Sequence, residues 1–193
     1  MFLRKAAIRP IPRYAVVETA ALDSVDQLLG DEEHDLQSTL DQGYNEFERR
    51  QPALSRYLAD EIARRHDELA QSLGYFLAVT IYLSFREAFP TRLNEIDDRE
   101  LQLALDTLAT DEALRENDPL EVLESDDVIA LRQPAVLDYV QHHVHEALEQ
   151  AGDETDVADL DRVYRSILVE VIALSHAVDA PPHERERAAN DLS

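Results

Sequence analysis

Residues 73–89 read LGYFLAVTIYLSFREAF, and this stretch decides how the rest of the chain can fold. Residues 73–85 carry no charge, and on a helical wheel they leave no polar face. A helix that is apolar on all sides lies either in a protein core or in a membrane. A membrane span needs about 20 apolar residues, whereas this shorter run contains Gly74 and meets Arg86 and Glu87. The stretch therefore predicts the buried central helix of a protein that does not span a membrane.

The composition supports a single helical domain around that core. The chain has 193 residues, of which 45% are hydrophobic and only 4 are glycine. Such a length suits one domain with a substantial core. The low glycine content argues against a β-sandwich and against a glycine-rich phosphate-binding loop. We therefore expect an all-α fold, a compact bundle of about six main helices.

The charge of the chain limits its partners. The formal net charge is −23 at pH 7, and Lys5 is the only lysine among 18 basic residues. A large negative charge favours solubility and works against binding nucleic acid through its phosphates. A GC-rich genome or adaptation to high salt explains this composition without any function. An acidic mimic of DNA that inhibits a DNA-binding protein is a functional alternative.

Cysteine usage and the N-terminus bound the chemistry and the compartment. Cysteine is absent, which excludes disulfides, thiolate zinc sites and cysteine nucleophiles. Near the N-terminus, Arg4, Lys5, Arg9 and Pro10 interrupt any apolar run of the kind a secretory signal needs. We therefore expect a cytoplasmic protein that contacts no membrane.

Charge and proline content divide the chain into three regions. Residues 1–17 carry four positive charges, no negative charge and two prolines, which predicts an extended basic arm. Residues 18–178 are expected to form one all-α domain, with a first half over about 31–90 and a second half over about 97–178. Residues 179–193 begin with prolines and are rich in charge, which is typical of a disordered tail.

Helix start and stop signals place the individual helices. The expected helices cover 23–29, 31–50, 52–70, a central helix that ends before Pro90, a helix capped by Asp97 and Asp98, 134–150, and 156–178. The helix over 52–70 is expected to continue into the central helix with a kink near Gly74. Residues 111–131 predict two or three short turns.

The two halves are similar in sequence. The segment RQPALSRYLADEIARR at 50–65 resembles RQPAVLDYVQHHVHEA at 132–147, which lies 82 residues later. Arg, Gln, Pro, Ala and Tyr are identical in the two segments, and three further positions hold an apolar residue in both. An offset of 89 places Tyr75 on Tyr164, and a seven-residue insertion in the loop AGDETDV explains the changed offset. The pattern predicts an internal duplication, with two pseudo-symmetric halves that pack against each other.

A histidine cluster is the one candidate for a metal site. On a helix, His142, His145, Asp138 and Glu146 share one surface. Imidazole and carboxylate groups spaced three and four residues apart can hold a divalent metal ion. The matching positions of the first half carry no histidine, and His143 borders the core. A solvated helix face is the plain explanation, so we expect no cofactor, with a divalent metal ion as the alternative.

Three polar residues lie beside strongly apolar stretches. Gln51 and Gln133 each precede a proline, and we expect each side chain to bond the last carbonyl groups of the preceding helix. Glu170 interrupts the most apolar part of the last helix. An arginine partner or a position at the rim of the core is expected, and a buried acid with a raised pKa is the alternative.

Together these patterns favour a non-catalytic protein, whose catalytic residues are accordingly not assigned. No coherent catalytic set, phosphate loop or cofactor motif is present in the sequence. We expect a cytoplasmic helical module with an interaction or regulatory role, which binds another protein or associates with itself, most simply as a homodimer. Direct nucleic-acid binding is not expected. Two alternatives stay open: a metal-dependent enzyme that uses the His142/His145 face, and the acidic DNA mimic.

Overall fold

The computed structural model describes residues 10–30, 35–117, 132–151, 156–182 and 184, and these residues are largely helical. They form one turn of 3-10 helix, η1 (Arg13–Ala15), and the α-helices α2 (Thr19–Leu29), α3 (Leu36–Arg50), α4 (Pro52–Ala63), α5 (Glu68–Ala88), α6 (Asp98–Asn117), α7 (Pro134–Ala151) and α8 (Val157–Ala177). Within the described ranges no β-strand occurs, and a single isolated bridge joins Leu93 and Val178. The all-α prediction is confirmed, with seven α-helices rather than about six.

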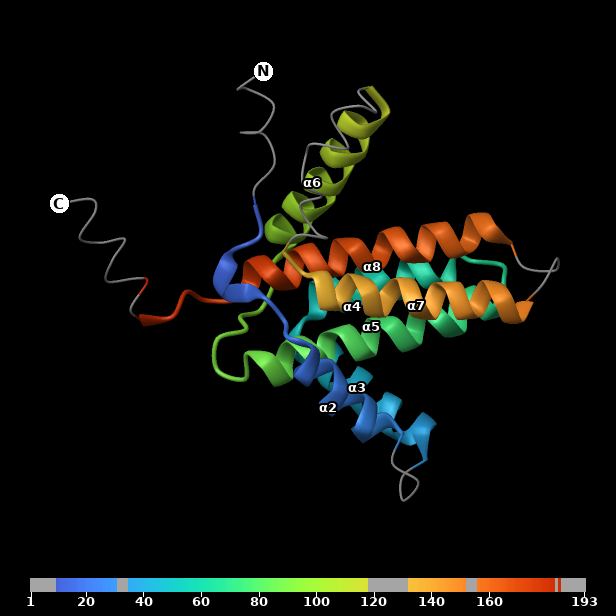
Figure 1. The fold of residues 1–193 in the computed structure, drawn as a ribbon, viewed down its shortest axis with the longest axis horizontal. Coiled ribbons are helices and arrows are strands. Elements are labelled where there is room, and N and C mark those ends of the chain that lie inside the picture. The colour runs from blue at the N-terminus through green and yellow to red at the C-terminus, as the bar shows by residue number, and fades with distance from the viewer. Residues whose placement is uncertain (1–9, 31–34, 118–131, 152–155, 183, 185–193) are drawn as a thin grey trace.

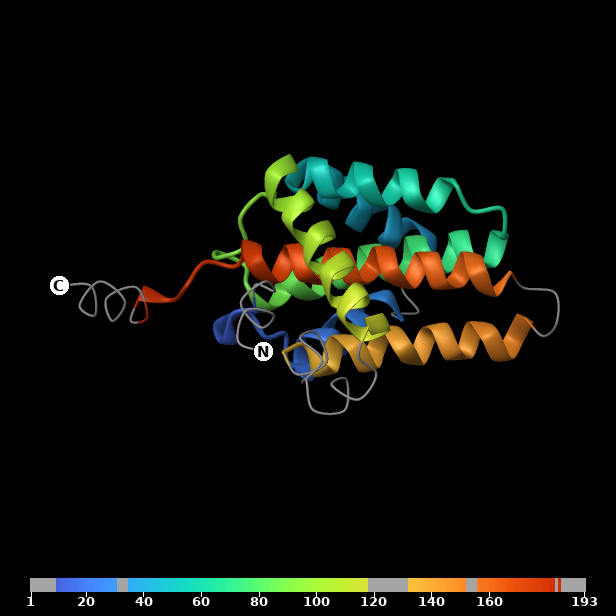
Figure 2. The same ribbon diagram turned by 90° about the horizontal axis from the view of Figure 1, so that it is seen from above.

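Helices α5 and α8 form the centre of the bundle (Figure 1). They pack against each other, and every other α-helix contacts at least one of them. From above, α4, α8 and α7 run side by side, and α6 crosses over α8 (Figure 2). The core therefore lies around two long apolar helices, each covered by shorter amphipathic ones.

The central stretch of the sequence is buried as predicted. Every residue from 77 to 85 is buried, and the same holds for residues 169–175 in α8. The two hydroxyl groups inside α5 bond backward along their own helix: Thr80 Oγ1 donates to the Phe76 carbonyl at 2.8 Å, and Ser84 Oγ donates to the Thr80 carbonyl at 2.8 Å. In the part of the chain that is described, no helix is long and apolar enough to cross a membrane.

The expected continuous helix over 52–70 is instead broken before α5. Asp67 is the N-cap of α5, and its side chain accepts a hydrogen bond from the backbone N–H of Ala70 at 2.9 Å. Asp159 of α8 accepts bonds from the backbone N–H groups of His66 and Asp67 at 2.8 and 3.3 Å, which lowers its pKa. Gly74 then lies inside α5, where an added Cβ would come 3.0 Å from Ile62 Cγ1, so close packing rather than a kink explains this glycine.

Two other helix boundaries differ from expectation. Helix α2 begins at Thr19 rather than at Asp23. Helix α6 begins at the predicted capping box, in which the side chains of Asp97 and Glu100 each accept the other's backbone N–H at 2.7 and 3.1 Å. It continues to Asn117 instead of ending before residue 111. The remaining turns predicted up to residue 131, and the predicted helix start over 31–34, lie outside the described residues.

Two buried glutamines each hold an extended segment of backbone. Gln51 Nε2 donates to the carbonyl of Asn94 at 2.7 Å, and its Oε1 accepts the N–H of Ile96 at 2.8 Å. Gln133 Nε2 likewise donates to the carbonyl of Ala15 at 2.5 Å, and its Oε1 accepts the N–H of Val17 at 2.9 Å. An extended chain presents a carbonyl and an N–H on one side, which a primary amide matches. The prediction that these side chains bond the preceding helix is therefore wrong.

The ends of the described chain lie against this body. Ile11, Ala15 and Val17 are buried, so residues 10–17 contribute to the core. At the other end, Asp179 N donates to the carbonyl of Arg92 at 2.8 Å. The expected extended arm over residues 1–17 is therefore wrong for its described part, residues 10–17, and its residues 1–9 lie outside the described residues, as does most of the expected tail.

Several pairs of helices share features at similar spacings along the chain. Helices α5 and α8 each have 21 residues, and Asp67 and Asp156 are their N-caps, 89 residues apart. Helix α2 buries Leu22, Val25 and Leu29, and α6 buries Leu101, Ala104 and Leu108, each 79 residues later. Helix α7 has 18 residues and α4 has 12, so the extra length of the second half is partly helical.

Candidate functional sites

The possible metal ligands of α7 come together on its exposed side. His142, His143 and Glu146 each offer one ligand atom, and these atoms lie within 4.8 Å of one another. His142 Nε2 and His143 Nδ1 are both 3.4 Å from a carboxylate oxygen of Glu146. Two imidazoles and one carboxylate form a set that zinc accepts, with a position left open for water or substrate.

The structure groups only part of the predicted set. His145 pairs with Glu149 at 3.2 Å, and Asp138 is exposed, so both lie outside the group. His143 takes their place because its ring packs edge-on against Phe76 and Tyr139, at centroid distances of 5.2 and 4.4 Å. Its position at the border of the core thus fixes the ring orientation.

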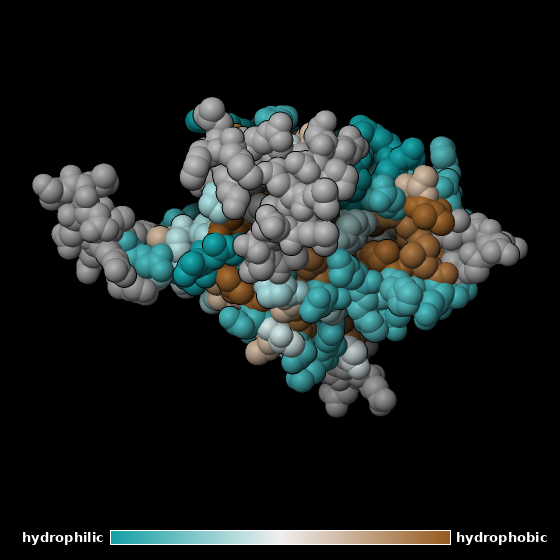
Figure 3. Space-filling view, turned by 45° about the horizontal axis from the view of Figure 1, so that its top comes forward, coloured by the Kyte–Doolittle hydropathy of each residue, from teal (hydrophilic) through white to brown (hydrophobic). Residues whose placement is uncertain are grey.

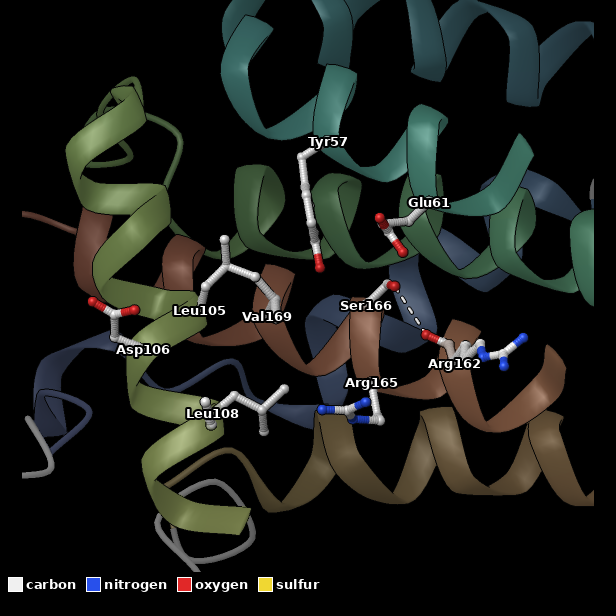
Figure 4. A pocket seen from close by; sticks show the side chains of 10 residues that line it. Tyr57, Glu61, Leu105, Asp106, Leu108, Arg162, Arg165, Ser166 and Val169 are labelled. Carbon is white, nitrogen blue, oxygen red and sulfur yellow. Dashed lines mark hydrogen bonds between the residues drawn. The ribbon is translucent and has the colours of Figure 1, made fainter. Parts of the chain in front are cut away.

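A pocket of about 310 Å³ lies between α4, α6 and α8 (Figure 4). It is lined by Tyr57, Glu61, Leu105, Asp106, Leu108, Ala109, Arg162, Arg165, Ser166 and Val169. Sequence reasoning missed this pocket because its walls come from three segments that are far apart in the chain. We refer to it as the α4/α6/α8 pocket.

The charged groups of the pocket are held by neighbours at its rim. Arg165 makes a bidentate contact with Glu112, in which Nε and Nη2 each lie 2.6 Å from a carboxylate oxygen. This contact raises the pKa of Arg165, which therefore keeps its charge. Arg162 Nη1 donates to Asp159 at 3.2 Å. Burial raises the pKa of the Tyr57 hydroxyl, which stays protonated and able to donate a hydrogen bond.

The lining of the pocket combines apolar and charged side chains. Its one serine, Ser166, donates its hydroxyl hydrogen to the carbonyl of Arg162 at 2.9 Å (Figure 4). No histidine is among the lining residues. The pocket offers an apolar wall with two guanidinium groups and the carboxylates of Glu61 and Asp106 beside it.

A strip of apolar side chains is exposed where α7 ends and α8 begins. Its members are Val144, Leu148, Val157, Tyr164 and Leu168, which we call the α7–α8 strip. Val157 is 64% exposed and Leu148 is 36% exposed, and the other three are half-buried. Figure 3 shows hydrophobic residues gathered at this end of the molecule. The sequence carried a signal for it, two large apolar residues at facing helix ends.

The face of α5 that carries Tyr75 and Val79 is covered by α3. An added Cβ on Gly43 would lie 2.7 Å from Val79 Cγ1, which shows how closely α3 approaches α5. Phe47 stacks on Tyr82 with ring centroids 4.6 Å apart. Tyr75 donates its hydroxyl hydrogen to Asp41 of α3 at 3.0 Å. Val79 is fully buried as a result, whereas the residue 89 positions later, Leu168, is half-buried.

Glu170 lies deep in the core of α8. It is fully buried, and neither carboxylate oxygen has a hydrogen-bond partner in the described structure. Burial raises the pKa of this carboxyl group well above the ordinary value, because the charged form is poorly solvated there. The expected arginine partner and the expected rim position are both wrong. The residue 89 positions earlier is Ile81, which is also fully buried.

Comparison of the chain with protein-family models, with curated proteins and with solved structures gives no significant match. The function must therefore be argued from the chain's own residues.

Proposed function

We propose that the protein is a non-catalytic cytoplasmic interaction module whose α7–α8 strip docks an amphipathic helix of a partner protein. The observation that carries this proposal is the exposed apolar strip itself, because the corresponding face of the first half is covered by α3. An apolar strip between two helices is a surface on which a third helix can lie. The proposal includes no direct contact with nucleic acid or membrane.

The comparison of the two faces rests on an internal duplication, which we also propose. The buried glutamines support it, because Gln51 and Gln133 make the same pair of backbone hydrogen bonds. Gln51 bonds segment 94–96 and Gln133 bonds segment 15–17, and these segments are 79 residues apart. Equal lengths of α5 and α8 support it as well. Each glutamine holds the segment that enters the other half, so the two units are interlocked.

Helix α3 provides a template for the partner. Its buried positions are Leu40, Gly43 and Phe47, an apolar residue, a small residue three positions later and a large apolar residue four positions after that. The small residue allows close approach to the helix beneath. A partner helix with this spacing could cover Tyr164 and Leu168, as α3 covers Tyr75 and Val79 in the first half.

Charge restricts the partner further. The chain has a net charge of −23, and Asp138, Glu149 and Asp161 are exposed on α7 and α8. A partner helix with Lys or Arg along its edges would be attracted to this surface, and a helix with acidic edges would be repelled. We therefore expect binding that weakens as salt is added.

A peptide titration tests the proposal. The probe is a fluorescein-labelled peptide with the α3 spacing and lysines at its outer positions, measured by anisotropy. In the variant Leu148→Glu/Val157→Glu the affinity should fall at least about tenfold, because two carboxylates then face the apolar edge. Leu103→Glu is the matched control, since Leu103 is 45% exposed on α6. Unchanged affinity in the double variant contradicts the proposal.

Light scattering on the same proteins separates a partner from a second copy. We expect wild type and the double variant to have the same mass. A wild-type dimer that the double variant dissociates would assign the strip to self-association, and the partner proposal would be wrong.

A second candidate function is divalent metal binding, supported by the 4.8 Å grouping of His142, His143 and Glu146. It keeps open a metal-dependent enzyme at this face. Calorimetric titration with Zn²⁺ should show one site, which His142→Ala abolishes and His145→Ala retains. No uptake of zinc, or equal loss in both variants, contradicts this candidate.

A further inference from the structure

The α4/α6/α8 pocket has a counterpart between α7, α2 and α5, which we call the α7/α2/α5 region. Under the proposed duplication, Tyr57 corresponds to Tyr139, Glu61 to His143, and Arg165 to Phe76, at offsets of 82, 82 and 89 residues. Each region lies beside a helix that follows an extended segment and packs on a central helix: α2 on α5 in one case, and α6 on α8 in the other. The two regions thus occupy equivalent places in the fold but are lined by different side chains.

The α7/α2/α5 region is filled by aromatic rings. His143 lies edge-on to Phe76 at 5.2 Å and to Tyr139 at 4.4 Å. The hydroxyl of Tyr139 donates to Asp26 of α2 at 2.7 Å, which closes the region from the side of α2. Three rings and a carboxylate therefore complete the packing there.

In the α4/α6/α8 pocket two of those rings are absent. Arg165 and Glu61 stand at their positions, and only the ring of Tyr57 is kept, so about 310 Å³ stays open. Leu105 stands at the position that corresponds to Asp26, 79 residues later. With Leu108 and Val169 it forms an apolar wall (Figure 4). The open space therefore has the surroundings that enclose aromatic rings in the other half.

The polar groups beside this space favour a negative charge on the occupant. Glu112 engages Nε and one hydrogen of Nη2 in Arg165, which leaves N–H groups for another acceptor. Arg162 is 57% exposed at the same rim. The two carboxylates of the lining are already engaged, Glu61 with Arg64 and Arg65, and Asp106 with the side-chain amide of Gln102 at 2.9 Å, and so do not call for a cation.

We propose that the α4/α6/α8 pocket binds a small aromatic carboxylate, with the ring against Leu105, Leu108 and Val169 and the carboxylate on Arg165. The ring of the ligand would occupy the space that Phe76 and His143 fill in the α7/α2/α5 region. A volume of about 310 Å³ is at the lower end of the range for ligand pockets, which fits a single-ring compound. This site is separate from the α7–α8 strip, and its function does not depend on a protein partner.

Calorimetric titration of the full chain tests the proposal, with phenylacetate as probe and with acetate and 2-phenylethylamine as comparison compounds. The titrations are made in high salt, since the net charge of −23 otherwise repels any anion. Phenylacetate should bind at least about tenfold more tightly than either comparison compound. Equal binding of acetate would show that the ring is not recognised, and equal binding of the amine would show that the charge is not.

Two variants locate the site. Arg165→Phe installs the ring that the first half has at Phe76, and it should reduce phenylacetate affinity at least tenfold without lowering Tm. Arg165→Gln keeps the space and removes the charge, and should also reduce affinity at least tenfold, which protects the test if the first variant folds poorly. Arg56→Gln, an exposed arginine of α4 outside the pocket, should leave affinity unchanged. Binding that survives both Arg165 variants, or no binding of phenylacetate to wild type, overturns the proposal.

Discussion

Helices α5 and α8 have equal length and share the centre of the bundle, but their surroundings differ. Around α5, Val79 is covered by α3 and Ile81 is an ordinary buried aliphatic residue. Around α8, the corresponding Leu168 is half-exposed and the corresponding Glu170 is a buried acid without a partner. A pocket and the α7–α8 strip also lie beside α8. The surroundings of α8 are thus less completely packed than those of α5, and the proposed function assigns binding to this less covered side.

The largest effect should come from a charge placed at the covered position. Val79→Asp should unfold the protein, because an unpaired buried carboxylate costs several kcal/mol against a total stability of about 5–15 kcal/mol. Leu168→Asp, its counterpart on α8, should cost only about 1 kcal/mol because that side chain reaches solvent. Urea denaturation followed by circular dichroism measures both. Similar losses in the two variants would remove the contrast between the halves.

The two buried glutamines should be equally important. Gln51→Ala and Gln133→Ala each remove both partners of a backbone carbonyl and N–H, of which Ile96 N–H, Val17 N–H and the Ala15 carbonyl are buried, and each should cost about 3 kcal/mol. Gln141→Ala is the control, because Gln141 is exposed and makes only a 3.4 Å contact with Tyr164. The same denaturation experiment applies. A loss confined to one glutamine would argue that the halves are held together differently.

Replacing the buried acid should make the halves more alike. Glu170→Met should raise stability at pH 7 by about 2 kcal/mol, because the wild type must bind a proton on folding. The folded-state pKa lies above the unfolded value near 4.5, so the stability contributed by Glu170 is complete below that pH. It then falls by about 1.4 kcal/mol per pH unit as the pH rises toward the folded-state pKa.

Thermal unfolding of wild type and Glu170→Met between pH 4 and 8 checks the sign. The two curves should converge at the acid end and separate as pH increases. A constant difference across the range would show that Glu170 is ionised in the folded protein, contrary to its burial.

A smaller effect is expected where α3 meets α5. Gly43→Val should destabilise the protein by about 2 kcal/mol, because a Cβ would already come 2.7 Å from Val79 Cγ1 and 3.1 Å from Leu83 Cδ1. Gln42→Val, at the neighbouring exposed position, should change stability by less than about 1 kcal/mol. If both variants melt alike, α3 does not fit as tightly as the geometry indicates.

The sequence predicted those features that depend on local periodicity and capping. The run at 77–85 is apolar on all sides, and the Asp97–Glu100 capping box is a local pattern, so both were predictable. The partners of Gln51 were not, because Asn94 and Ile96 come from a distant segment that folding brings to it. Glu170 was misjudged for a similar reason, since helices remote in sequence determine how deeply α8 is buried.

The candidate sites were less predictable than the fold. The sequence placed His142 and Glu146 on one surface, but only the packing of His143 against Phe76 shows which atoms meet. The α4/α6/α8 pocket and the α7–α8 strip arise where side chains from separate helices leave space or remain uncovered. Leu148 and Val157 at facing helix ends gave a local signal for the strip, whereas the pocket has no signature in a single chain segment.

Hydrogen–deuterium exchange of the full chain, with and without the lysine-edged helical peptide, tests the central claim most directly. If the second half carries the docking surface, the peptide should slow exchange in residues 144–151 and 157–168 and leave α4 and α5 unchanged. Protection confined to α3, α4 and α5 would contradict the assignment of binding to the second half.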